Sequence, residues 1–148
     1  MILSLTYGRF PWHRGFAVID ETGALRFTAK GGLTRLVLKD PDGNDAGCVV
    51  WRGFPFRREC GLFAGGRMVG AVKRSPLPPY PTIKLDLCGW TAGADVYGLT
   101  FITGPDGERI ADIRRDIGLS RRKLSVAVYS DENVLPALLA ALAAERIV

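Results

Sequence analysis

The sequence contains a single histidine, three cysteines and no apolar run long enough to cross a membrane, and these shortages exclude several classes of protein. The sequence has no G-x-S-x-G or similar nucleophile motif to accompany His13, which argues against a Ser-His-Asp catalytic triad or a Cys-His catalytic dyad. Cys48, Cys60 and Cys88 form no Cys-x-x-Cys pair, so we expect reduced, buried thiols rather than a zinc site. The acidic residues are scattered and single out no catalytic pair. We therefore predict no enzyme, no metal and no cofactor.

Recognition motifs for nucleotides, nucleic acids and export are also missing. The glycines of GLFAGGRMVG match neither a P-loop nor a dinucleotide fingerprint. No RNP motif, zinc finger or helix-turn-helix is found, so nucleic acid is not an expected partner. The first residues, MILSLTYGRFPW, lack the basic leader and long apolar region of a secretory signal, and Arg9 interrupts them early. We expect a cytoplasmic protein without a transmembrane segment.

The stretch from Asn133 to Val148 predicts a helix that is apolar on every side until Glu145. Asn133 is suited to the N-cap, and Pro136 is tolerated in the first turn, where its missing N–H has no partner in any case. The roughly 14 residues reach about 21 Å, which is too short to span a membrane. The rest of the protein must therefore enclose this helix. Its apolar residues form a leucine stripe and an alanine back: Leu135, Leu138, Leu139, Leu142, Ala137, Ala140, Ala141, Ala143 and Ala144.

The remainder of the chain alternates between apolar and polar residues in short segments, which is typical of β-strands. The inward-facing sets are expected to be Ile83, Leu85 and Leu87, then Leu124, Val126 and Val128, and also Tyr97, Leu99 and Phe101. Besides the segment around Tyr97–Phe101, the predicted strands are Gly15–Ile19, Leu25–Lys30, Thr34–Lys39, Gly47–Trp51, Phe54–Phe63, Met68–Lys73, Thr82–Cys88, Glu108–Arg114 and Lys123–Tyr129.

Three related turns separate these strands and indicate hairpins. Asp20 and Gly23, then Asp40 and Gly43, share an Asp-x-x-Gly spacing, and Gly104-Pro105-Asp106-Gly107 replaces it in a third turn. Many antiparallel strands and one apolar helix combine economically when the sheet closes around the helix. We predict a mainly β protein, a closed antiparallel barrel of about twelve strands enclosing the C-terminal helix, with residues 1–148 as one domain. The proline-rich segment 75–81 is either a connector or a ligand for SH3-like modules.

Charge supplies the remaining functional signal, because 20 Lys and Arg residues face 15 Asp and Glu residues. The excess gathers around the segment Asp116–Ser120, which is expected to be the turn between the last two strands. Arginine forks suit phosphate oxygens, so a cluster can hold an anionic ligand or surface. The alternative is a solubilising rim that binds nothing specific. The cations of this predicted basic rim are Arg114, Arg115, Arg121, Arg122 and Lys123.

Five segments, in order along nearly the whole chain, resemble the tubby C-terminal-like fold and its LURP-one-related and phospholipid-scramblase-like branch. They are GFAVIDETGALRF, LVLKDPDGN, LFAGGRMVGAVKR, FITGPDGERIADIRR and LSVAVYSDENVLPALLAALAAERIV. The resemblance implies a twelve-stranded barrel around a buried helix. It also implies a link to phospholipid, since tubby binds phosphoinositide headgroups through basic side chains and scramblases act at membranes. The chain lacks the scramblase cysteine cluster and proline-rich N-terminal region, which argues against scrambling itself.

Two functional hypotheses from different classes follow. The first is a non-enzymatic module, peripheral at the membrane, that binds anionic phospholipid, phosphoinositide or another phosphate-bearing ligand through the basic rim. The second is a protein-interaction or structural domain, homo-oligomeric or with an unknown protein partner, whose basic surface is incidental. Exposure of Trp12, Trp51 or Trp90 would favour the second hypothesis, because large aromatic residues anchor interfaces.

Overall fold

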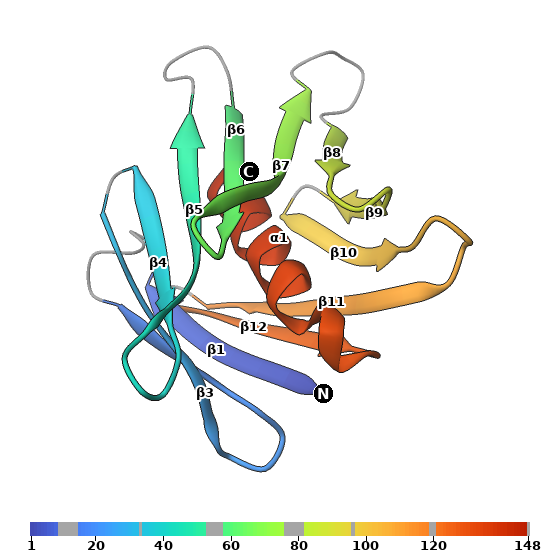
Figure 1. The fold of residues 1–148 in the computed structure, drawn as a ribbon. Helices are drawn as coiled ribbons and strands as arrows, with labels where there is room; N and C mark the ends of the chain where they lie inside the picture. The colour runs from blue at the N-terminus through green and yellow to red at the C-terminus, as the bar shows by residue number, and fades with distance from the viewer. Residues whose placement is uncertain are drawn as a thin grey trace.

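A computed structural model describes residues 1–8, 15–32, 34–52, 58–75, 82–95, 97–118 and 121–147. It contains one antiparallel sheet of twelve strands, a 3₁₀ turn and one α-helix (Figure 1). The predicted mainly β architecture is confirmed. The elements are β1 Ile2–Gly8, β2 Phe16–Ile19, β3 Leu25–Gly31, β4 Arg35–Lys39, β5 Asp45–Arg52, β6 Arg58–Ala64, β7 Arg67–Ser75, β8 Thr82–Asp86, β9 Thr91–Asp95, β10 Gly98–Thr103, β11 Arg109–Ile117, β12 Arg121–Val128, η1 Asp131–Asn133 and α1 Val134–Ile147.

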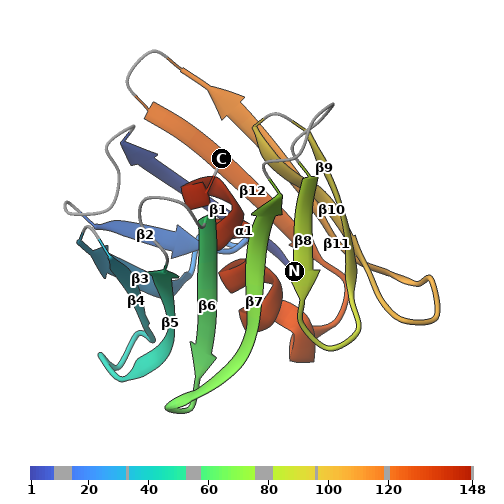
Figure 2. The same ribbon diagram turned by 90° about the horizontal axis from the view of Figure 1, so that it is seen from above.

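The sheet curls into a nearly closed barrel. Hydrogen-bonded neighbours run from β8 back through β7 to β1, and then through β12, β11 and β10 to β9. Pairing of β1 with β12 joins the first strand to the last. The two end strands, β8 and β9, lie side by side (Figure 2) but share no ladder among the described residues. The barrel is therefore nearly closed, whereas the sequence predicted full closure.

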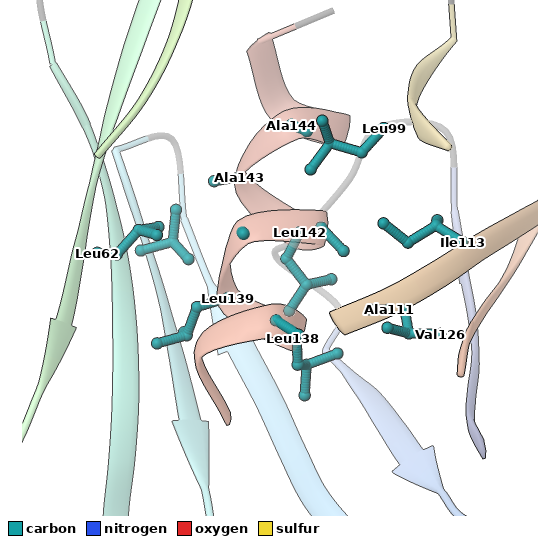
Figure 3. Packing of buried hydrophobic residues seen from close by; sticks show 14 of the residues in the cluster. Leu62, Leu99, Ala111, Ile113, Val126, Leu138, Leu139, Leu142, Ala143 and Ala144 are labelled. Carbon is teal, nitrogen blue, oxygen red and sulfur yellow. The ribbon is translucent and has the colours of Figure 1, made fainter. Parts of the chain in front are cut away.

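Helix α1 runs through the middle of the barrel, as Figures 1 and 2 show. It contacts strands on both sides, from β5, β6 and β7 to β10, β11 and β12. Leu138 and Leu139 are fully buried, and the alanines expected on its back are buried as well. Leu139 points toward Leu62, whereas Leu142 lies nearer Ile113 (Figure 3). The prediction of an enclosed apolar helix, with Pro136 as its third residue, is confirmed.

Glycine at position 47 lets the helix approach the wall of the barrel. A Cβ added to Gly47 would lie 3.2 Å from both Cδ atoms of Leu139. The strand backbone there forms a floor against which the leucine packs. The core of the fold therefore depends on a missing side chain in β5 as well as on the leucines of the helix.

Two strands were not predicted, and one predicted orientation is wrong. β1 lies in the N-terminal stretch that was considered only as a possible leader, and β9 is the glycine- and alanine-rich run TAGAD. Leu99 is buried as expected, but Phe101 and Tyr97 are exposed. A bulge between Leu99 and Phe101 inserts one residue against β9, which turns Phe101 outward and Ile102 inward.

The cysteines differ in their exposure, although all three were expected to be buried. Cys60 is buried and directs its thiol at the Ala143 carbonyl, whereas Cys48 is half-buried. Cys88 is exposed because strand β8 ends at Asp86, two residues earlier than predicted, and Cys88 occupies the following turn with φ of 52°. The proline-rich residues 76–81 lie outside the described residues, as do His13 and Trp12.

The three related turns form as predicted. The Gly23, Gly43 and Gly107 amides donate to the carbonyls of Asp20, Asp40 and Gly104, each at 3.0 Å. All three glycines have positive φ, between 81° and 84°, which is why glycine is used there.

Candidate functional site

The five cations of the predicted basic rim divide between the two faces of the β11–β12 hairpin. The sequence ended the first strand at Arg114 and began the next at Lys123, but the ladder continues outward to the pair Ile117 and Arg122. Because neighbouring residues of a strand point to opposite faces, the extended ladder separates them. The prediction that all five meet at one rim is therefore wrong. Arg114, Arg121 and Lys123 are exposed on the outer face, whereas Arg115 and Arg122 lie on the inner face.

The two inner arginines meet a carboxylate from the helix. Glu145, in the last turn of α1, has a side chain that is only 1% exposed. Arg115 Nε donates a hydrogen bond to its Oε1 atom at 2.8 Å, and Arg115 Nη2 lies 2.6 Å from the same oxygen in an ion pair. On the other side of the carboxylate, Tyr7 donates to Oε2, and Arg122 Nη1 lies 3.6 Å from the same atom. We call Tyr7, Arg115, Arg122 and Glu145 the inner cluster.

One backbone carbonyl and a second carboxylate complete the inner cluster around Arg115, whose side chain is 7% exposed. Arg115 Nη2 also donates to the Leu99 carbonyl at 2.6 Å, and Nη1 lies 3.6 Å from an Asp95 carboxylate oxygen. Gly98 leaves room for these contacts. A Cβ at that position would lie 2.8 Å from Glu145 Oε1 and 2.9 Å from Arg115 Nη2. The cluster thus ties the end of the helix to β1, β10, β11 and β12.

The inner cluster changes the acid–base behaviour of its tyrosine. Burial raises the pKa of Tyr7 well above its ordinary value of 10.0, and the charge and hydrogen bond of Glu145 add to the increase. Tyr7 therefore stays protonated and continues to donate to Glu145 over the whole physiological range. Because Arg115 and Arg122 both form ion pairs with Glu145, we assign them to the support of the helix and not to ligand binding.

The outer cations border a groove of about 570 Å³ on the surface of β1, β2, β11 and β12. Two cross-strand rows run over it: Ser4, Ser125 and Arg114 are register partners, and so are Thr6, Lys123 and Asp116. Arg121, two residues before Lys123 on the same face, adds a third cation beside the groove. Among the described residues, no ion pair engages Arg114, Arg121 or Lys123. The residues that line this outer groove are Ser4, Leu5, Thr6, Ile19, Arg114, Arg115, Asp116, Lys123, Leu124 and Ser125.

The groove combines two kinds of group that bind oxyanions. Arginine and lysine supply positive charge and N–H donors, and the hydroxyls of Ser4, Thr6 and Ser125 can donate to the remaining oxygens. One acidic residue, Asp116, partly offsets the charge, which leaves the outer cations in excess. The arrangement is suited to holding a phosphate group at the surface.

Sequence reasoning missed the three hydroxyl residues and Glu145. Ser4 and Thr6 became visible only with β1, where Leu3, Leu5 and Tyr7 are buried and the residues between them face outward. The signal was present, because this stretch alternates between apolar and polar residues. For Glu145 the signal was a charged residue at the end of an apolar helix, where the helix is still enclosed.

Comparison with known proteins gives a likeness of structure alone. No protein-family model and no curated protein matches the chain. The X-ray structure of a protein from Arabidopsis thaliana is similar, with a TM-score of 0.57 and 17% sequence identity over 93% of this chain and 89% of that chain. The shared property is the fold. At this identity the likeness carries no activity or ligand across.

Among the described residues, no helix has the length and apolar character needed to cross a membrane.

Proposed function

We propose that this protein is a non-enzymatic module that binds a phosphate-bearing ligand, in the first place an anionic phospholipid headgroup, through the outer groove. The observation that carries the proposal is the alignment of Arg114 and Lys123 with Ser4, Thr6 and Ser125 across β11, β12 and β1. The predicted site is thereby reduced from five cations to the three outer ones. Arg115 and Arg122 are left to the inner cluster.

The exposure of the outer cations determines how such binding behaves. Each cation near an anionic leaflet contributes about 1 kcal/mol, and salt screens the attraction within a Debye length of about 8 Å at physiological strength. Three cations give modest affinity for any anionic surface. Selectivity for one headgroup over another therefore depends on the hydroxyls of Ser4, Thr6 and Ser125. We therefore expect weak, multivalent binding whose salt dependence separates attraction to charge from recognition of phosphate.

We also propose that the chain is a cytoplasmic member of the tubby C-terminal-like family, in its LURP-one-related and scramblase-like branch, with residues 1–148 as one barrel domain. The barrel around an apolar C-terminal helix supports this placement. The five motif segments quoted above, in family order, support it as well. Peripheral attachment to the cytoplasmic leaflet, which carries anionic lipid, would follow from the outer groove.

Vesicle co-sedimentation tests the proposal. The wild type is compared with a variant carrying Arg114→Ser, Arg121→Ser and Lys123→Ser, on neutral, phosphatidylserine and phosphoinositide vesicles at low and physiological salt. A matched control, Lys30→Ser, Lys73→Ser and Lys84→Ser, removes equal charge from exposed positions on β3, β7 and β8. We expect the groove variant to lose headgroup-dependent binding and the control to retain it. Equal loss in both variants, or no wild-type binding at physiological salt, would contradict the proposal.

A protein-interaction function is the second candidate, and one surface favours it. Phe101 and Tyr129 are exposed, and the Arg109 guanidinium lies 4.3 Å from the centre of the Phe101 ring. Two of the three tryptophans named above give no such support, since Trp90 is buried and Trp51 is half-buried, and Trp12 lies outside the described residues. Sedimentation velocity over a range of protein concentrations tests the homo-oligomeric form of this hypothesis. A concentration-independent monomer would argue against it.

A further inference from the structure

A second groove, of about 470 Å³, lies on the outer face of β4, β5 and β6. These strands are neighbours in the sheet, and Figure 1 shows them on the side of the helix that faces away from β11 and β12. Val37, Cys48 and Phe63 are register partners across the three strands, and Val50 follows Cys48 on the same face. All four side chains line the groove and are half-buried. The floor of this apolar groove is therefore hydrocarbon, thiol and aromatic ring.

The charges around the apolar groove are unequal. Asp45 lines it, but Lys39 Nζ lies 3.3 Å from an Asp45 carboxylate oxygen and offsets its charge. Arg35 lines the groove at the other end of the β4–β5 hairpin, opposite Val50. Among the described residues, no acidic side chain pairs with Arg35. Among the described residues that line the groove, Arg35 is thus the one cation, at one end of a hydrocarbon floor, and Arg52 lies beside that floor with its guanidinium 5.7 Å from the centre of the Phe63 ring.

We propose that the apolar groove binds a free single-chain amphiphile with an anionic head, such as a fatty carboxylate. The hydrocarbon chain would cover Val37, Cys48, Val50 and Phe63, and the head would meet Arg35. Removal of apolar surface from water drives binding of the hydrocarbon chain to the floor. A charge-assisted hydrogen bond from Arg35 then fixes the position of the anionic head. The volume lies within the range of about 300–1,000 Å³ that small-molecule sites occupy.

This inference goes beyond the proposed function and does not depend on it. The outer groove is formed by β1, β2, β11 and β12, whereas the apolar groove is formed by β4, β5 and β6. Its ligand is a dispersed amphiphile, in contrast to a headgroup held in a membrane. Failure of either proposal therefore leaves the other intact.

Protection of Cys48 from alkylation gives a site-specific test. The full chain is treated with iodoacetamide, with and without dodecanoate held below its micelle-forming concentration, and labelling is quantified by mass spectrometry of the cysteine peptides. Exposed Cys88 lies outside the apolar groove and serves as the internal reference. We expect dodecanoate to slow Cys48 labelling while Cys88 labelling is unchanged. Dodecyltrimethylammonium has the same chain and the opposite charge. It should need a concentration at least about tenfold higher than dodecanoate to give the same protection of Cys48.

Two variants test the role of the cation. Arg35→Gln removes it, and Val50→Asp supplies it with an internal carboxylate from the register-paired position on β5. Both should weaken dodecanoate protection about tenfold or more, whereas the control Lys84→Gln on β8 should not. Thermal unfolding confirms that each variant is folded. The proposal is overturned if dodecanoate gives no selective protection of Cys48, if the cationic amphiphile protects equally, or if both folded variants protect like the wild type.

Discussion

Replacing Glu145 with alanine should be one of the most destabilising single changes in this protein, although Glu145 is a charged side chain at the edge of an apolar core. Glu145 accepts one hydrogen bond from Arg115 Nε and one from Tyr7, and it forms a close ion pair with Arg115 Nη2. Its removal leaves the Arg115 guanidinium, which is only 7% exposed, with the Leu99 carbonyl and a distant Asp95 oxygen as partners. The tyrosine hydroxyl loses its acceptor at the same time.

The size of the effect follows from this geometry. Removing one partner of a buried ion pair costs about 3–5 kcal/mol, because the other charge stays buried without compensation. Arg122 provides the contrast, since its side chain is 25% exposed and 3.6 Å from the carboxylate. Partly exposed pairs of this kind contribute at most about 1 kcal/mol. The structure therefore predicts a large cost for Glu145→Ala and a small one for Arg122→Gln.

Equilibrium urea unfolding, followed by tryptophan fluorescence, measures both variants. With a denaturant slope of about 2 kcal/mol per molar urea, Glu145→Ala should lower the unfolding midpoint by about 1.5–2.5 M. Arg122→Gln should lower it by less than about 0.5 M on the same slope. If Glu145→Ala also shifted the midpoint by less than about 0.5 M, the buried ion pair would not be holding the helix, and the reasoning would be refuted.

Three further predictions concern the core and its cluster. Leu139→Asp buries a carboxylate against an apolar wall at a fully enclosed position and should cost more than about 4 kcal/mol, so the urea midpoint followed by far-UV circular dichroism should fall by more than about 2 M; native stability would refute the enclosed helix. Gly98→Ala combines a φ of 141° with a Cβ against Glu145 and Arg115, so it should lower stability by about 1–3 kcal/mol in urea; an unchanged midpoint would show that the cluster has room to spare. Because the pKa of Tyr7 is raised by folding, the stability it provides is present below its ordinary pKa of 10.0 and is lost as the pH rises above that value. The stability difference between wild type and Tyr7→Phe should therefore shrink as the pH is raised from 8 to above 10, and a difference that stays constant would place the hydroxyl outside the cluster.

The helix and most strands could be predicted because their signals are local. An apolar surface all round α1 leaves no arrangement except enclosure, and alternation assigned Leu124, Val126 and Val128 to the interior correctly. β9 was missed because its run of glycine and alanine carries no alternation. The orientation of Phe101 was wrong because a bulge shifts the inside–outside parity by one residue, and a bulge leaves little mark on the sequence.

The candidate site was predicted only in part, since proximity along the chain was taken for proximity in space. Arg114 and Arg115 are adjacent, but strand geometry sends one to the outer groove and the other to Glu145. The length of the β11–β12 ladder decides on which face each cation lies. If the turn had started at Asp116, strand alternation would not have separated the cations. The ladder reaches Ile117, so alternation applies to every one of them.

The central claim is that the outer groove is the site at which phosphate-bearing ligands bind. Amide chemical-shift mapping of the isotopically labelled protein, titrated with soluble inositol trisphosphate at physiological salt, tests it most directly. The account predicts saturable shifts confined to β1, β11 and β12, centred on Thr6, Arg114 and Ser125. Chemical-shift changes centred on other strands would contradict it, and so would the absence of saturable changes at physiological salt.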